Sequence, residues 1–189
     1  CFEILKDKKT AILTVASFNY YPWNNLNVFK DFMDTRFKEI HEKGIKNLSI
    51  DVRFNSGGSA ESSIHLLKYL VDKPFTYYAE SQIKKGSGKS EGEIPQAPFV
   101  NAFKGKLYLM MVGIGQSTTV HFMATVKVLK LGTIVGEELG SNQYCTAGQT
   151  IARLSNTKLN YFIADTGVET MATSLPDETG VLPDHYVTQ

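Results

Sequence analysis

The sequence has 189 residues, enough for one compact domain with a buried core. With a formal net charge of +1 and a charged fraction of 21%, the chain lacks the excess of basic residues that would favour nucleic-acid binding. The same values exclude an acidic, disordered chain. No apolar run is long enough to span a bilayer. Cys1 and Cys145 make neither a metal-ligand spacing nor a disulfide framework. We expect no metal and no cofactor.

Strand and helix patterns alternate in the first half of the chain. Thr10 to Phe18 is rich in β-branched and apolar residues, which predicts a strand. Apolar residues then repeat at three and four, which predicts a helix from Asn27, as its cap, to about Lys43. A short strand at Asn47 to Val52 and a helix at Ala60 to Val71 follow, and Phe75 to Ile83 is predicted to be a strand.

The second half continues the alternation. Lys106 to Val112 is an apolar strand of the kind expected in a sheet that is buried on both faces. A buried helix at Ser117 to Lys130 and a short strand at Thr133 to Val135 come next. Two further strand patterns, at Gln149 to Leu154 and at Leu159 to Ala164, predict a β-hairpin. The pattern predicts an α/β fold with a mostly parallel sheet and a C-terminal β-hairpin.

The first candidate site is the turn Asn55-Ser56-Gly57-Gly58-Ser59, between a predicted strand and a predicted helix. Two consecutive glycines let the backbone approach a ligand closely, because no Cβ is in the way. At a helix N-terminus their N–H groups can hold an anion or an oxyanion. The alternative is a tight strand-to-helix turn that binds nothing.

The second candidate site is the turn Gly113-Ile114-Gly115-Gln116-Ser117-Thr118, again between a strand and a helix. A serine in this position presents its hydroxyl beside N–H groups that stabilise developing negative charge, as a nucleophile requires. The Gly-x-Ser-x-Gly pattern of a nucleophile elbow is absent. The alternative is that Ser117 serves only as a helix N-cap.

Four motifs together resemble those of the C-terminal-processing (tail-specific) and tricorn-core serine peptidases. In chain order they are Ile50-Asp51-Val52-Arg53-Phe54-Asn55-Ser56-Gly57-Gly58-Ser59, Gln116-Ser117-Thr118-Thr119, Val135-Gly136-Glu137-Glu138 and Gly180-Val181-Leu182-Pro183-Asp184. The resemblance implies a crotonase/ClpP-like fold of repeated ββα units, as one peptidase core domain over residues 1–189. It also implies a polypeptide substrate and an extracytoplasmic location.

The same resemblance assigns roles to residues of this chain. Ser117 would be the nucleophile that forms the acyl-enzyme. Backbone N–H groups near Gly57 or Gly58 and at Thr118 would form the oxyanion hole. Glu137 and Glu138 would support the site by hydrogen-bonding a histidine or holding the loop; the alternative is a solvated acidic pair at a strand end.

The general base is the part of the family pattern that this chain does not match. Asn142 stands about where one branch of the family has a lysine, and an amide cannot take a proton. His121, one helical turn after Ser117, is a candidate base; the alternative is a structural histidine. The tricorn-like branch takes its base from a segment N-terminal to the core, so we interpret the chain, which lacks an initiating Met, as a fragment without its N-terminal and PDZ-like regions.

Three functions therefore stay open from the sequence. The first is a serine peptidase that hydrolyses polypeptides. The second is a degenerate relative that binds peptides without cleaving them. The third is a crotonase-like enzyme that acts on an acyl thioester, although no pair of carboxylates is placed for that chemistry. In addition, Tyr20, Tyr21 and Trp23 could line a peptide groove or form a small satellite core.

Overall fold

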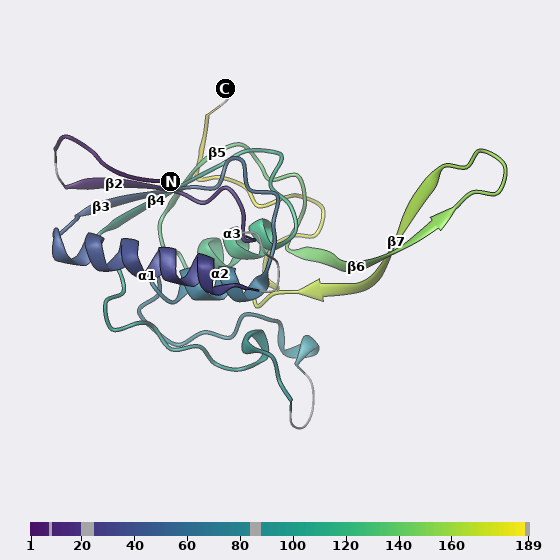
Figure 1. The fold of residues 1–189 in the computed structure, drawn as a ribbon, viewed down its shortest axis with the longest axis horizontal. Helices are drawn as coiled ribbons and strands as arrows, with labels where there is room; N and C mark the ends of the chain where they lie inside the picture. The colour runs from purple at the N-terminus through teal and green to yellow at the C-terminus, as the bar shows by residue number, and fades with distance from the viewer. Residues whose placement is uncertain (8, 20–24, 84–87, 188–189) are drawn as a thin grey trace.

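A six-stranded sheet forms the centre of this computed structural model, which describes residues 1–7, 9–19, 25–83 and 88–187. The strand order is β1-β2-β3-β4-β5-β8 (Figure 1). Their bounds are Phe2–Ile4 for β1, Thr10–Thr14 for β2, Asn47–Asp51 for β3, Lys106–Met111 for β4, Thr133–Gly136 for β5 and His185–Tyr186 for β8. β1 is antiparallel to β2, and every other neighbouring pair is parallel, which confirms the prediction of a mostly parallel sheet.

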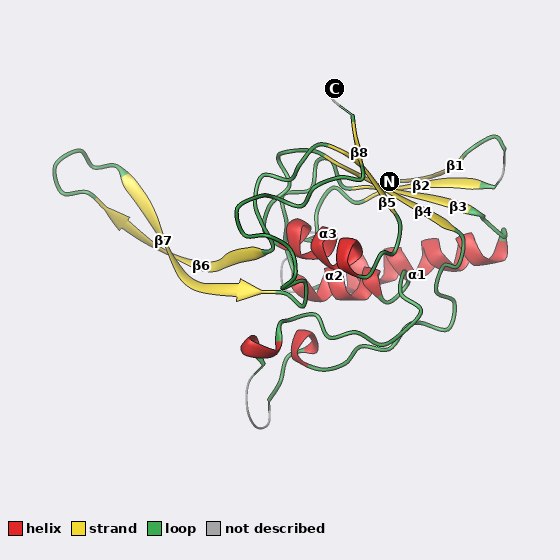
Figure 2. Cartoon of the chain, turned by 180° about the vertical axis from the view of Figure 1, so that it is seen from behind, coloured by secondary structure: helices red, strands yellow, loops and turns green. Residues whose placement is uncertain are grey.

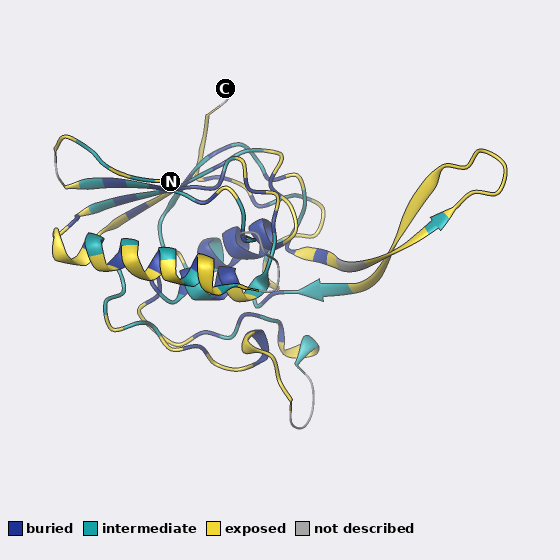
Figure 3. Ribbon diagram, in the orientation of Figure 1, coloured by how far each residue is buried: buried dark blue, intermediate teal, exposed yellow. Residues whose placement is uncertain are grey.

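Three helices cover one face of this sheet, as Figure 2 shows. They are α1 (Asn27–Glu42), α2 (Ala60–Leu67) and α3 (Thr118–Val128). The sheet buries the alternate side chains that point toward them: in β4, Leu107, Leu109 and Met111 are buried, whereas Tyr108 is 38% exposed. In Figure 3, α1 alternates between buried and exposed residues, whereas α3 is mostly buried. The prediction that β4 is buried on both faces is therefore wrong, because the helices pack on one side only.

Two further predictions of local structure are corrected. Phe75 to Ile83 is not a strand: it makes single bridges to two different partners, at Gln96 and at Thr170, and then forms a 3-10 helix at Glu80–Gln82. A strand needs one continuous neighbour, and this segment has none in the part of the chain that the structure describes. Asn27 does not cap α1; it is the first helical residue, and the carboxamide oxygen of Asn25 accepts a hydrogen bond from its N–H at 3.2 Å.

The β-hairpin is confirmed and is longer than predicted. Its antiparallel strands are β6 (Tyr144–Arg153) and β7 (Asn160–Glu169), and the hairpin extends away from the helices (Figure 1). Its base continues into the body of the molecule, where Thr170 bridges to Tyr78. A second 3-10 helix, Glu91–Glu93, lies in the loop before β4. Within the described residues, none of the helices has the length and apolar character needed to cross a membrane.

Candidate active site

The two glycine- and serine-containing turns lie against each other at the carboxyl ends of β3 and β4. The Thr118 hydroxyl donates a hydrogen bond to the Gly58 carbonyl oxygen at 2.6 Å. A Cβ placed on Gly57 would come within 2.8 Å of the Ser117 Cβ. Ligand sites in open parallel sheets lie beyond the carboxyl ends of strands. The fold therefore brings both predicted constellations into one site.

Ser117 occupies the N-cap position of α3 without acting as a cap. Its side chain makes no capping hydrogen bond, and the residue is exposed. Its backbone has φ 55° and ψ −132°, a region that a non-glycine residue adopts at a cost. Among the described residues, no side chain hydrogen-bonds to its hydroxyl. The strained backbone thus holds a free hydroxyl at the start of a helix, which is the geometry of an exposed nucleophile.

The glycine turn offers one of its two N–H groups to a ligand. The Gly57 N–H already donates to the Asn55 carboxamide oxygen at 2.9 Å, within the buried part of the turn. The N–H groups of Gly58 and Thr118 have no hydrogen-bond acceptor among the described residues. Both glycines have positive φ, 114° for Gly57 and 140° for Gly58, which side-chain-bearing residues rarely adopt. Two free donors therefore flank the serine hydroxyl.

A buried polar network fixes the two turns relative to the sheet. The Asn55 amide donates to the Val15 carbonyl at 3.0 Å. Its carboxamide oxygen accepts from the Gly57 N–H and, at 2.7 Å, from the Thr119 hydroxyl. Asn55 is fully buried. One side chain thus joins the end of β2, the glycine turn and the start of α3.

We expect Asn55→Ala to lower the unfolding free energy by about 2 kcal/mol, because it leaves two buried polar groups, the Val15 carbonyl and the Gly57 N–H, without partners at about 1 kcal/mol or more each. The Thr119 hydroxyl keeps a hydrogen bond to the backbone carbonyl of residue 55 at 3.0 Å. Thermal or urea unfolding followed by circular dichroism measures this. Asn156→Ala, at the exposed tip of the hairpin, is the control and should stay within about 0.5 kcal/mol of wild type. Equal unfolding curves for the two variants would contradict the role of the network.

His121 lies in the same region, and its backbone N–H donates to the Ser117 carbonyl at 3.2 Å, but its imidazole makes no hydrogen bond to the Ser117 hydroxyl. The residue is 5% exposed, and its Nε2 has no hydrogen-bond partner among the described residues. Burial lowers the pKa of His121 to about 4, against a smaller opposing effect of a hydrogen bond to the Val168 carbonyl. The imidazole is therefore neutral at pH 7, and no hydrogen bond connects it to the serine hydroxyl.

The low pKa of His121 predicts a pH-dependent stability. An unfolded histidine has a pKa near 6.5, so between pH 6.5 and 4 the unfolded chain binds a proton that the folded chain does not. Stability should therefore fall by about 3 kcal/mol as the pH drops through this window. His121→Phe should flatten the dependence there, as measured by urea unfolding at several pH values. Parallel curves for wild type and variant would contradict it.

Glu138, one of the two predicted supporting residues, holds a loop in place. Glu138 Oε1 accepts a hydrogen bond from the Gly180 N–H at 2.8 Å, so two of the four sequence motifs are in direct contact. Glu137 is half-buried. The Asn142 amide donates to the Asp177 carbonyl, and its oxygen accepts from the Tyr144 N–H at 3.0 Å. Asn142 therefore holds a turn and offers Ser117 no base.

Cys145, for which no sequence pattern indicated a role, contacts Ser117. Its sulfur lies 3.5 Å from the Ser117 carbonyl oxygen. Burial raises the pKa of this thiol to about 11, so it is not a nucleophile at neutral pH. No spacing in the sequence indicates this contact, because the residues are far apart in the chain. Tyr20, Tyr21 and Trp23, considered for a peptide groove, lie outside the described residues.

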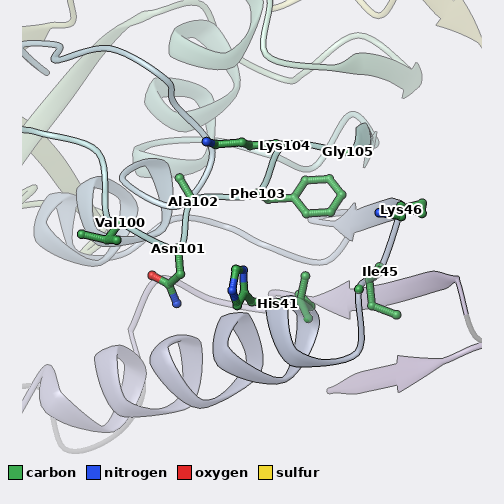
Figure 4. Close-up of a pocket in the computed structure, with 11 residues that line it drawn as sticks. His41, Ile45, Lys46, Val100, Asn101, Ala102, Phe103, Lys104 and Gly105 are labelled. Atoms are coloured by element: carbon green, nitrogen blue, oxygen red, sulfur yellow. The ribbon is translucent and has the colours of Figure 1, made fainter.

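A cleft of about 500 Å³ opens beside Ser117. It is lined by Gly58, Ala60, Tyr78, Ser117, Thr118, His121, Cys145, Thr146, Gln149 and Val168. A second cavity, of about 350 Å³, is lined by His41, Lys46 and Phe103 among others (Figure 4). It lies at the amino ends of β3 and β4, where Lys46 and Gly105 precede the strands. Of these two, the first is the one lined by residues of the glycine turn and the serine turn, namely Gly58, Ser117 and Thr118.

Comparison with known proteins relates this chain to a family of peptidases. The model of peptidase family S41 matches residues 9–187. No curated protein matches the chain. Among solved structures, the photosystem II D1 C-terminal processing protease superposes with a TM-score of 0.64 at 20% identity, over 95% of this chain and 42% of that protein.

Two other solved structures share the fold. A putative S41 protease from Bacteroides fragilis has a TM-score of 0.66 at 13% identity, over all of this chain (100%) and 50% of that one. Mature CPAF has a TM-score of 0.62 at 12% identity, over 94% of this chain and 46% of that one. At these identities the likeness shows the fold alone. The chain spans half or less of the length of each of these three proteins.

Proposed function

Because the chain belongs to peptidase family S41, we propose that it is the core of a serine peptidase that hydrolyses polypeptides through an acyl-enzyme on Ser117. The observation that carries the proposal is the strained, uncapped serine beside two unpaired backbone N–H groups, those of Gly58 and Thr118. A nucleophile and an oxyanion hole are the two parts that acyl transfer needs in fixed relation.

In the proposed reaction the Ser117 oxygen attacks the peptide carbonyl carbon and loses its proton to a base. The carbonyl oxygen becomes an oxyanion, which the N–H groups of Gly58 and Thr118 stabilise at the N-terminus of α3. The C–N bond then breaks, and the amine leaves with a proton. Water attacks the acyl-enzyme in the same way and releases the new carboxyl terminus. Gly57 supports the turn, since its own N–H is bound to Asn55.

The proposal assigns the base to a histidine from another part of the full-length protein, as in the tricorn-like branch that the sequence resembles. Two observations favour this assignment. The pKa of His121 is lowered to about 4, so its imidazole is a weak base, and its Nε2 has no hydrogen-bond partner among the described residues. Asn142 holds a turn. The same observations favour a second candidate function, a degenerate relative that binds peptides without cleaving them.

Labelling of the full-length protein with a fluorophosphonate distinguishes the two functions. A peptidase should be labelled at Ser117, with peptide mapping to locate the adduct. Ser56→Ala, which removes an exposed hydroxyl of the neighbouring turn, should be labelled like wild type. Peptide binding without labelling or cleavage would favour the degenerate relative and reject the peptidase.

We also propose an extracytoplasmic location for the full-length protein, on the sequence resemblance alone. Cell fractionation with an antibody to this domain tests it. Recovery of the protein with cytoplasmic markers would reject the location and leave the proposed chemistry intact.

A further inference from the structure

The outer part of the β-hairpin exposes a set of large apolar side chains. Its strands β6 and β7 extend away from the helices in both views (Figure 1 and Figure 2). The exposed residues, each between 44% and 64% exposed, are Ile151, Leu154, Leu159, Tyr161, Phe162 and Ile163. A hairpin of two strands is only marginally stable by itself in water, and clustered apolar surface of this kind marks a contact site. The hairpin therefore has the character of an interface.

Most of these side chains lie on one face of the hairpin. Ala152 is paired with Tyr161 in the ladder. Two residues further toward the turn, the Leu154 N–H donates to the Leu159 carbonyl at 2.9 Å. Residues opposite each other in a ladder share a face, and so do residues two apart in a strand. The apolar face of the hairpin is therefore formed by Ala152, Leu154, Leu159, Tyr161 and Ile163.

The charges of the hairpin are divided along its length. The tip, residues 151–163, carries Arg153 and Lys158 and no acidic residue. The base, residues 144–150 and 164–169, carries Asp165 and Glu169 and no basic residue. The strand between Lys158 and Asp165 spans roughly 20 Å at about 3.4 Å per residue, so the two do not pair within one hairpin. A second hairpin that lies antiparallel to the first brings a basic tip against an acidic base.

We propose that the apolar face of the hairpin binds the same face of a second copy of this chain, with the two hairpins antiparallel. A two-fold axis near Tyr161 makes this contact self-complementary, since each copy offers the other the same surface. Leu159, Tyr161 and Ile163 of both copies pack at its centre. Lys158 of each copy lies beside Asp165 of the other copy, so the dimer contains two such ion pairs.

The exposed apolar area fits a pair of hairpins. At roughly 100 Å² for each of the four large side chains on the apolar face, two copies together offer about 800 Å². A little over half of a typical interface is apolar, so this value corresponds to a total interface of about 1,400 Å². Stable, specific interfaces bury about 1,200 to 2,000 Å² in total. Two copies of the hairpin are therefore sufficient for a dimer, without any further protein.

Sedimentation of the full-length protein tests the contact. The wild type should form a dimer at micromolar concentration. Leu159→Ser removes an apolar side chain from the centre of the contact twice in each dimer, so it should raise the dissociation constant by about 100-fold. Val100→Ser, at a fully exposed apolar residue outside the hairpin, is the matched control and should sediment like the wild type.

An exchange of charges identifies which residues meet. Lys158→Glu alone and Asp165→Lys alone each place two pairs of like charge in the dimer, and each should raise the dissociation constant by about tenfold. An equimolar mixture of the two variants should form heterodimers as tight as the wild-type dimer, because both pairs are then opposite in charge. The Asp165 carboxylate also accepts a hydrogen bond from the Thr150 hydroxyl at 2.8 Å, so the mixture is more decisive than either variant by itself.

Three results would overturn the proposal. The first is a full-length protein that stays monomeric throughout the micromolar range; protection of its hairpin from hydrogen exchange would then assign the apolar face to another part of the same molecule. The second is a dimer that Leu159→Ser does not weaken. The third is a mixture of the two charge variants that associates no more tightly than either variant alone. Association is measured without substrate, so none of these results bears on hydrolysis at Ser117.

Discussion

Ser117→Ala should reduce peptide hydrolysis by the full-length protein by about 10⁴-fold or more, the usual effect of removing a serine nucleophile. The physical reason is that the variant keeps the two free N–H groups but has no atom to form the acyl-enzyme. Its stability should change little, because the exposed hydroxyl makes no capping bond. Steady-state kinetics and thermal unfolding of both proteins measure the two effects.

Ser56→Ala is the matched control for this substitution. Both serines are exposed and lie in adjacent turns, but only Ser117 has the strained backbone at the N-terminus of α3. The control should cleave at the wild-type rate. Residual cleavage by Ser117→Ala at more than a tenth of the wild-type rate would assign the nucleophile to another residue.

Gly57→Ala should reduce kcat/KM by about 10²-fold, because small displacements of reacting groups have effects of this size. The added Cβ would lie 2.8 Å from the Ser117 Cβ and 3.2 Å from its hydroxyl oxygen. The serine must therefore move, and a backbone φ of 114° adds strain for alanine. Both stability and activity should fall. Steady-state kinetics measures the loss of activity, and urea unfolding measures the loss of stability.

Gly44→Ala separates backbone strain from steric displacement. Gly44 also has a positive φ, 62°, but a Cβ there would meet nothing within 4 Å. This variant should lose about 1 kcal/mol of stability through strain and keep full activity. If Gly57→Ala were as active as Gly44→Ala, the close approach of the glycine turn to Ser117 would have no catalytic importance.

The sequence alone was sufficient for the family and for most of the architecture. The apolar repeat of α1, the β-branched runs of β2 and β3 and the strand–turn–strand pattern of the hairpin are local, so each element was predicted approximately in place. Phe75 to Ile83 failed because its residues have strand character but no continuous neighbour. Strand propensity does not show whether a partner exists.

The burial of the sheet also required the tertiary structure. The residues of β4 are apolar on both faces, as in Tyr108 and Leu109, and composition alone favours a strand covered on both sides. Only the placement of all three helices on one face leaves Tyr108 exposed. The number of layers depends on which way each connection crosses the sheet, and the residues of the strand itself do not encode that.

The two turns were identifiable from the sequence because glycine pairs and a serine before a helix restrict the backbone at neighbouring positions. Which of their groups are free was decided by contacts between segments far apart in the chain. Asn55 occupies the Gly57 N–H and leaves that of Gly58 unpaired. Burial in the fold lowers the pKa of His121, so its imidazole is neutral at pH 7. A hydrogen-bonding group in a motif becomes available or unavailable only when the fold brings its partner, so the chemistry of this site is a property of the tertiary structure.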